Sequence, residues 1–171
     1  MKATAMSAET QPAECTGVEV QRATAGEAPA EDDIARWVEA VLDAVPVRDG
    51  GPGPAGRGEL CVRLVDEAES ATLNEQYRHK RGPTNVLSFP AELEVPDARF
   101  WGDVVVCVPL VHREAAEQGK TASAHFAHLV VHGVLHLLGY DHQSAAEADQ
   151  MESLERGILD RFGVADPYGE G

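Results

Sequence analysis

The segment AHFAHLVVHGVLHLLG, residues 124–139, constrains the fold of this chain more than any other. Its polar side chains are four histidines at helical spacing: His125, His128, His132 and His136. A helix that is apolar on nearly every side has to be covered on several sides, so the segment predicts a helix buried in the middle of a domain. Gly139 is predicted to end this helix, because glycine adopts the left-handed conformation that closes many helices.

The remaining apolar pattern predicts both helices and strands. Helical spacing predicts four further helices, over residues 33–45, 66–77, 109–118 and 144–162. Runs rich in β-branched residues predict three strands, over residues 59–65, 84–89 and 102–108. Between them, residues 49–58 and 91–100 are predicted loops. This order indicates an α+β fold, a small mixed β-sheet packed with helices, with the histidine helix at its centre.

The length of 171 residues suits one domain. Residues 1–30 are rich in Ala, Glu, Thr and Pro without apolar periodicity, so they are predicted to be a disordered N-terminal tail. Residues 31–165 are then a single folded domain, and residues 166–171 a flexible C-terminus. No apolar run approaches the roughly 20 residues of a membrane span, and the N-terminus does not resemble a secretory signal. The expected location is the cytoplasm.

Charge and cysteine content narrow the possible chemistry. The net charge of −15 opposes nonspecific binding to a polyanion. One window is locally basic, YRHKRG at residues 77–82, which contains Arg78, Lys80 and Arg81. A phosphate contact is expected there.

The three cysteines, Cys15, Cys61 and Cys107, are too far apart for a CxxC motif. Their number and spacing do not suit a disulfide framework either. Cys61 and Cys107 fall in predicted strands, where buried and unreactive thiols are expected. Any metal binding therefore depends on histidine.

The spacing of three histidines suits a metal site. His132 and His136 lie four residues apart, so a helix projects both imidazoles from one face. Gly139 lets the chain turn back and bring His142 toward the same point. Three neutral imidazoles leave the fourth tetrahedral position of zinc open for water, which is the arrangement of a catalytic site. One zinc ion is the first choice of cofactor, although imidazole also suits nickel, copper or iron.

A histidine on an apolar helix is often just a hydrogen-bonded core residue. Against that interpretation, several buried histidines would each need a partner, since an unsatisfied buried polar group costs roughly 1–3 kcal/mol. His128, one turn before His132, is assigned a supporting or core role. Asp141 has two open interpretations: it orients an imidazole, or it caps the following helix.

Residue 133 bears on the reaction. The spacing of the three histidines is that of the peptidase pattern HExxHxxGxxH, with Gly133 in place of the glutamate. That glutamate is the general base of those peptidases, and glycine cannot take a proton. The sequence thus keeps the predicted metal ligands and loses the proteolytic base.

Three ordered segments resemble the YbeY family of bacterial endoribonucleases, the rRNA maturation factors. They are HGVLHLLGYDH at 132–142, YRHKRGPTNVLSFP at 77–90 and GDVVVC at 102–107. The resemblance spans roughly residues 60–162 and implies a zincin-like arrangement, with a metal-dependent hydrolase domain. It implies His132, His136 and His142 as zinc ligands and Arg78 as the critical arginine. One departure is Arg81, where family members usually have an acidic residue.

The same resemblance implies a single-stranded RNA substrate, processing of the 3′ end of 16S rRNA, and a role in ribosome quality control with the small ribosomal subunit as partner. A role of Arg78 in binding RNA also agrees with its chemistry, because a guanidinium can hold two phosphate oxygens at once. Lys80 and Arg81 are expected to assist in binding substrate. The alternative for Arg78 is a surface charge at a helix end.

Two other functions stay open: a zinc metallopeptidase, and a non-catalytic ribosome assembly module. No membrane partner is expected. A monomer is favoured.

Overall fold

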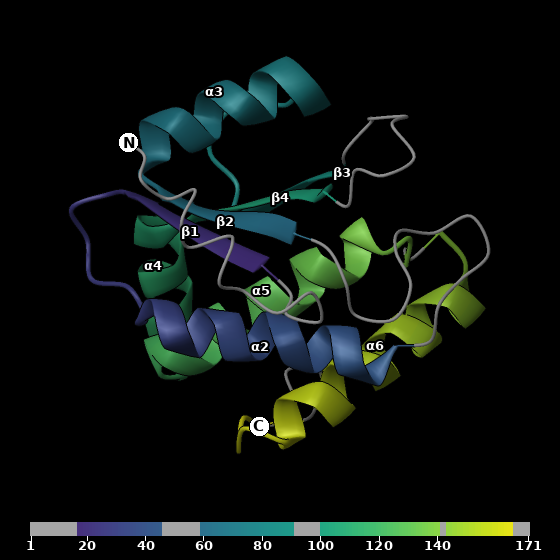
Figure 1. Ribbon diagram of the computed structural model, residues 1–171. Coiled ribbons are helices and arrows are strands. Elements are labelled where there is room, and N and C mark those ends of the chain that lie inside the picture. Colours follow the sequence, from purple (N-terminus) through teal and green to yellow (C-terminus); the bar gives the residue numbers. More distant parts are fainter. Residues whose placement is uncertain (1–16, 46–58, 91–99, 141–142, 166–171) are drawn as a thin grey trace, which may run out of the picture.

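The structure is a computed structural model that describes residues 17–45, 59–90, 100–140 and 143–165. Its elements in chain order are β1 (Gly17–Ala23), α2 (Glu31–Ala44), β2 (Glu59–Val65), α3 (Glu67–Arg78), β3 (Val86–Pro90), β4 (Phe100–Cys107), α4 (Val108–Gln118), α5 (Ala122–Leu137) and α6 (Ala145–Asp160). Figure 1 shows α3 on one side of the sheet and the other helices on the opposite side. The predicted loop at 49–58 lies outside the described residues, as does the predicted loop at 91–100 except for residue 100, where β4 begins.

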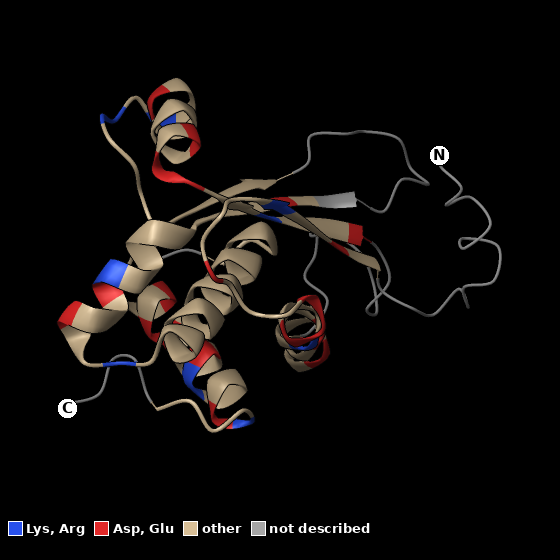
Figure 2. Cartoon of the chain, turned by 90° about the vertical axis from the view of Figure 1, so that its left-hand side faces the viewer, with Lys and Arg blue, Asp and Glu red and all other residues tan. Residues whose placement is uncertain are grey.

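The four strands form one mixed sheet in the order β1-β2-β4-β3. β1 and β4 pair in parallel with β2, whereas β3 runs antiparallel to β4. Figure 2 shows this sheet nearly edge-on, with acidic residues spread over the helices around it. The α+β prediction with a small mixed sheet is therefore confirmed, while the zincin-like arrangement stays a prediction.

The predicted disordered tail of residues 1–30 is wrong for its second half. Residues 17–23 form β1, an edge strand whose Val18 and Val20 pack against the core. The physical reason is a short alternation in GVEVQRA, where apolar and polar residues take turns and so suit a strand with one buried face. The folded domain thus includes residues before 31. Residues 1–16 and 166–171 lie outside the described part of the chain.

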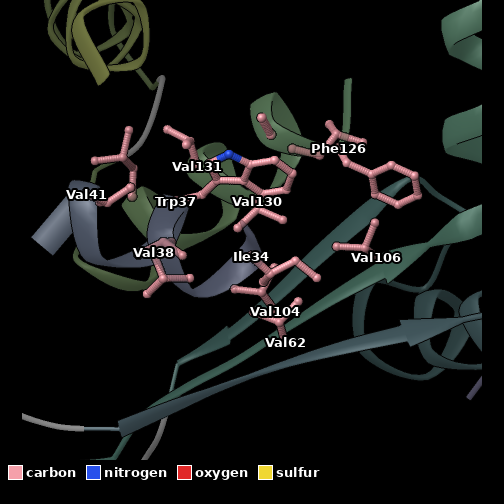
Figure 3. Close-up of a cluster of buried hydrophobic side chains, with 14 of the residues drawn as sticks. Ile34, Trp37, Val38, Val41, Val62, Val104, Val106, Phe126, Val130 and Val131 are labelled. Atoms are coloured by element: carbon pink, nitrogen blue, oxygen red, sulfur yellow. The ribbon is translucent and has the colours of Figure 1, made fainter. Parts of the chain in front are cut away.

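The histidine helix α5 is the centre of the domain, as predicted. It contacts α2, α4, α6 and the strands β3 and β4. Figure 3 shows one part of this core, where side chains of α2, α5 and the sheet meet. Its members come from all three: Ile34, Trp37, Val38, Val62, Val104, Val106, Phe126, Val130 and Val131. This packing holds the polar stripe of α5 at a fixed place relative to the sheet.

Both ends of the α5–α6 connection have the capping residues that commonly end and begin helices. Gly139 has a φ of 98°. The backbone N–H of Gly139 donates to the carbonyl of His136, and that of Tyr140 to the carbonyl of Leu135, which is the Schellman pattern. Ser144 is the N-cap of α6, and its hydroxyl accepts a hydrogen bond from the backbone N–H of Glu147 at 3.1 Å. The helix ends around the candidate site are therefore closed by local sequence.

Cys61 and Cys107 are buried, as predicted. Burial, with a smaller contribution from the neighbouring Asp103, raises the pKa of the Cys61 thiol to about 12. Burial also raises the pKa of the Cys107 thiol. Since the thiolate is the reactive form, neither cysteine is suited to nucleophilic or redox chemistry.

Within the described residues, no helix combines the length and the apolar character that a membrane crossing requires.

Candidate metal centre

Helix α5 aligns its four histidines one turn apart. Successive ring centroids are separated by 6.1 Å from His125 to His128, by 6.1 Å from His128 to His132, and by 4.7 Å from His132 to His136. The predicted pair, His132 and His136, is therefore the closest of the three neighbouring pairs. His142 and Asp141 lie outside the described residues, so their roles stay predictions.

A carboxylate from α6 reaches two of these histidines. Glu155 is fully buried, with one oxygen 2.6 Å from Nδ1 of His132 and the other 3.3 Å from Nε2 of His128. Because a carboxylate oxygen accepts hydrogen bonds, the short contact assigns the ring proton of His132 to Nδ1. Its Nε2 then carries the lone pair, which is the tautomer that a metal ligand requires.

His128, His132 and Glu155 could themselves hold a metal ion, since their ligand atoms all lie within 4.8 Å of one another. Two tetrahedral zinc ligands, however, lie about 3.3 Å apart at bond lengths near 2.0 Å. The 2.6 Å between His132 and Glu155 is instead a hydrogen-bond length. A carboxylate that orients a metal-binding imidazole in this way is a common arrangement around zinc. With Glu155 as the orienting group and imidazoles as the donors, the site fits a metal that prefers imidazole.

A cavity of about 610 Å³ opens onto the histidine pair. Arg78 comes to it from the end of α3, and His132 and His136 come from α5. The segment 84–90, which leads into and forms β3, supplies the rest of the wall together with Tyr77. The fold thus brings together two of the three segments that carried the sequence resemblance, although they are about 50 residues apart in the chain.

Two buried polar residues of α3 hold the loop that follows Arg78, and the sequence did not single them out. The hydroxyl of Ser70 donates to the carbonyl of Thr84 at 2.8 Å and accepts from the Thr84 backbone N–H at 3.0 Å. The side-chain amide of Asn74 donates to the carbonyl of Gly82 at 2.8 Å. These bonds tie the loop after α3 back onto the helix. The only sequence indication was polar residues on the inner face of a weakly amphipathic helix.

Lys80 and Arg81 lie on that loop and are exposed. Among the described residues that line the cavity, neither appears, whereas Arg78 does. The structure therefore brings Arg78 to the histidines and leaves Lys80 and Arg81 at the surface beyond it.

Gly133 faces the sheet and not the cavity. A Cβ at this position would lie 2.6 Å from Cγ1 of Val104, and the hydroxyl of Ser88 donates to the Gly133 carbonyl at 2.9 Å. A glutamate side chain has no room there. The absence of a general base at residue 133 is therefore also a packing requirement of α5 against the sheet.

His125 is a core histidine. Its Nε2 lies 2.8 Å from the carboxylate of Glu114 on α4, and burial lowers the pKa of its imidazole. The carboxylate of Glu114 also accepts from the side-chain amide of Asn85 at 3.0 Å. The stripe on α5 therefore divides into a structural end at His125 and a cavity end at His132 and His136.

Taken together, the fold and the site define a class: an α+β domain with a histidine site able to take a metal, open to a cavity that also holds a guanidinium. Comparison with known proteins agrees with this fold class and identifies the family. The sequence profile of the family described as "Endoribonuclease YbeY" matches residues 19–163, and the chain belongs to this family.

Individual relatives support the assignment. The protein named endoribonuclease YbeY of Stutzerimonas stutzeri is 52% identical over 155 residues, covering 90% of this chain and 91% of that one. The one of Alkalilimnicola ehrlichii is 52% identical over 169 residues, covering 95% and 97%. The solution structure of TM1509 from Thermotoga maritima shares the fold, with a TM-score of 0.54 at 24% identity over 90% of this chain and 99% of that one.

Proposed function

We propose that this protein is a zinc-dependent, single-strand-specific endoribonuclease that matures the 3′ end of 16S rRNA and takes part in ribosome quality control. The observation that carries the proposal is the cavity shared by Arg78, His132 and His136. Membership of a family whose relatives are named endoribonucleases supports the reaction class. The cytoplasm, the small ribosomal subunit as partner and a monomeric state are parts of the same proposal.

His132 and His136, with His142, are the proposed ligands of one zinc ion. A bound zinc ion would supply Lewis acid stabilisation of the charge that develops on the phosphate. Glu155 keeps the proton of His132 on Nδ1. Arg78 contributes a fixed positive charge on the same cavity wall, where a guanidinium can bind two phosphate oxygens. Hydrolysis of RNA requires this kind of positive environment at the reacting phosphate.

The acidic surface supports a substrate presented by a partner. With a net charge of −15, the protein repels free RNA at long range, so contact is confined to the few cationic groups at the cavity and on the neighbouring loop. Lys80 and Arg81 are proposed to contact the backbone of RNA that enters from that side.

Metal content tests the site. Purified protein is expected to contain about one zinc per chain by elemental analysis, and His136→Ala to lose it, because that substitution removes one of three imidazoles. His112→Ala is the matched control, since this histidine lies on α4 and contacts the carbonyl of Glu27 and the ring of Phe126. Full zinc retention by His136→Ala would contradict the ligand assignment.

Arg78→Ala tests the reaction. Cleavage of single-stranded RNA is expected to fall about 100-fold, because one charged group at the phosphate is lost, with zinc content unchanged. Arg36→Ala on α2, which removes an exposed arginine paired with Asp33, is expected to keep wild-type activity. RNA that stays intact with wild-type protein while casein is cut would favour a metallopeptidase. RNA that is bound but never cut would favour an assembly module.

A further inference from the structure

A second cavity, of about 470 Å³, lies beside the first. Its lining comes from α3, β2, β3 and β4: Arg63, Glu69, Leu73, Tyr77, Phe89, Pro90, Asp103 and Val105. Tyr77, Phe89 and Pro90 also line the cavity of the histidine pair, so the two cavities share one wall. A ligand that extends past the histidines therefore meets this wall next.

Tyr77 is the unusual residue of the shared wall. The residue is 62% exposed, and it is the large apolar residue that stands out at the surface of the described chain. Its ring lies 5.0 Å from that of Phe89 at an interplanar angle of 69°. The edge-to-face pair fixes the two rings, and the exposure of Tyr77 leaves aromatic surface open to solvent. Tyr77 also directly precedes Arg78 in the chain.

The charges of the second cavity do not favour a phosphate. The guanidinium of Arg63 donates from Nε and Nη2 to the two oxygens of Glu69, at 2.6 and 3.1 Å, and from Nη1 to Gln21 at 2.9 Å. Asp103 adds a second carboxyl group to the lining. The cavity thus has apolar walls and a polar side without spare positive charge, while Arg78 and the histidines lie across the shared wall. A nucleobase has the matching character, with flat apolar faces and a polar edge.

We propose that Tyr77, held by Phe89, is a stacking platform for the nucleobase next to the scissile phosphate, and that this base enters the second cavity. The inference rests on the proposed function and adds a subsite to it. It also gives a physical reason for single-strand specificity, because a base can reach this platform only when it is not paired and stacked in a duplex. Stacking on an aromatic side chain tolerates every base, so broad sequence preference follows.

The first experiment separates binding from chemistry. Tyr77→Ala is expected to raise KM for a single-stranded RNA oligonucleotide by about 5- to 150-fold, the range that loss of one base–aromatic stack gives. Because Arg78 and the histidines are retained, kcat is expected to change little. Tyr77→Trp, which keeps an aromatic face, is expected to retain wild-type KM, and thermal unfolding of all three proteins to be similar because the side chain is exposed.

The second experiment is a double-mutant cycle that combines removal of the Tyr77 side chain with removal of single bases from the RNA. Oligonucleotides carrying one abasic site at each position around the cut are bound to zinc-loaded wild type and to Tyr77→Ala, with a non-cleavable linkage at the cut. At one position next to the cut, loss of the base is expected to weaken binding to wild type as much as Tyr77→Ala weakens binding of the intact RNA. When the abasic RNA binds Tyr77→Ala, no further loss of affinity is expected. Independent, additive losses at every position overturn the platform.

The outcomes also separate the two proposals. If wild type cleaves the RNA and Tyr77→Ala has the same KM, the platform is wrong and the proposed function stands. If zinc-loaded wild type neither binds nor cleaves single-stranded RNA, the proposed function fails, and the inference that rests on it fails too.

Discussion

Gly133→Ala is expected to lower the free energy of unfolding by about 1–3 kcal/mol, and Gly133→Glu to prevent stable folding. The direction is the reverse of the usual one, since alanine in place of glycine inside a helix normally stabilises by about 1 kcal/mol. Here the new Cβ would lie 2.6 Å from Cγ1 of Val104 and 3.3 Å from Oγ of Ser88. Helix α5 would have to move away from the sheet. Urea unfolding followed by circular dichroism measures the change.

Gly157→Ala provides the matched control. This glycine lies within α6, and a Cβ there meets no atom within 4 Å. The same chemical change is therefore expected to stabilise by up to about 1 kcal/mol. If Gly133→Ala is as stable as Gly157→Ala, close packing is not the reason for glycine at residue 133. A folded Gly133→Glu protein with peptidase activity would further show that the missing carboxylate, and not the space, determines the reaction.

The sequence predicted most of the fold because its main elements carry strong local patterns. α5 is a long apolar run with histidines at helical spacing, and ELCVRLV is a short apolar run rich in residues that favour strands, while the helix ends at Gly139 and Ser144 have specific local chemistry. β1 was missed because its alternation covers only Val18 and Val20 within a polar, acidic segment. It is stabilised as a strand by pairing with β2, which is a long-range contact.

The residues of the candidate site differ in the same way: local helix geometry made some predictable, and long-range packing placed the others. The pairing of His132 with His136 follows from helix geometry and was predicted. The approach of Arg78 to the histidine cavity depends on how α3 is placed relative to α5 in the fold, so it followed only from the family resemblance. Glu155 was not predicted at all. It shares a buried face of α6 with Met151 and Ile158, and an acid at such a position was the one available indication.

Glu155→Ala is expected to lower the free energy of unfolding of the metal-free protein by about 1–3 kcal/mol, the usual cost of leaving a buried polar group without its hydrogen-bond partner. Both His128 and His132 lose the carboxylate that they contact at 3.3 and 2.6 Å. Zinc affinity is expected to fall about 10- to 100-fold, because the orientation and tautomer of His132 are no longer fixed. Chelator competition measures the affinity, and denaturant unfolding of metal-free protein measures the stability.

Two variants separate a positioning role from a merely structural one. Glu155→Gln keeps the shape and one acceptor oxygen, so it is expected to recover part of both quantities. Glu152→Ala on the same helix removes a partly exposed acid 3.8 Å from Arg156, and both quantities are expected to stay near wild type. If Glu155→Ala loses stability while zinc affinity is unchanged, the carboxylate serves the core alone. If affinity falls and Gln restores it, then Glu155 holds His132 in the form that binds metal, and the buried acid of α6 belongs to the functional site.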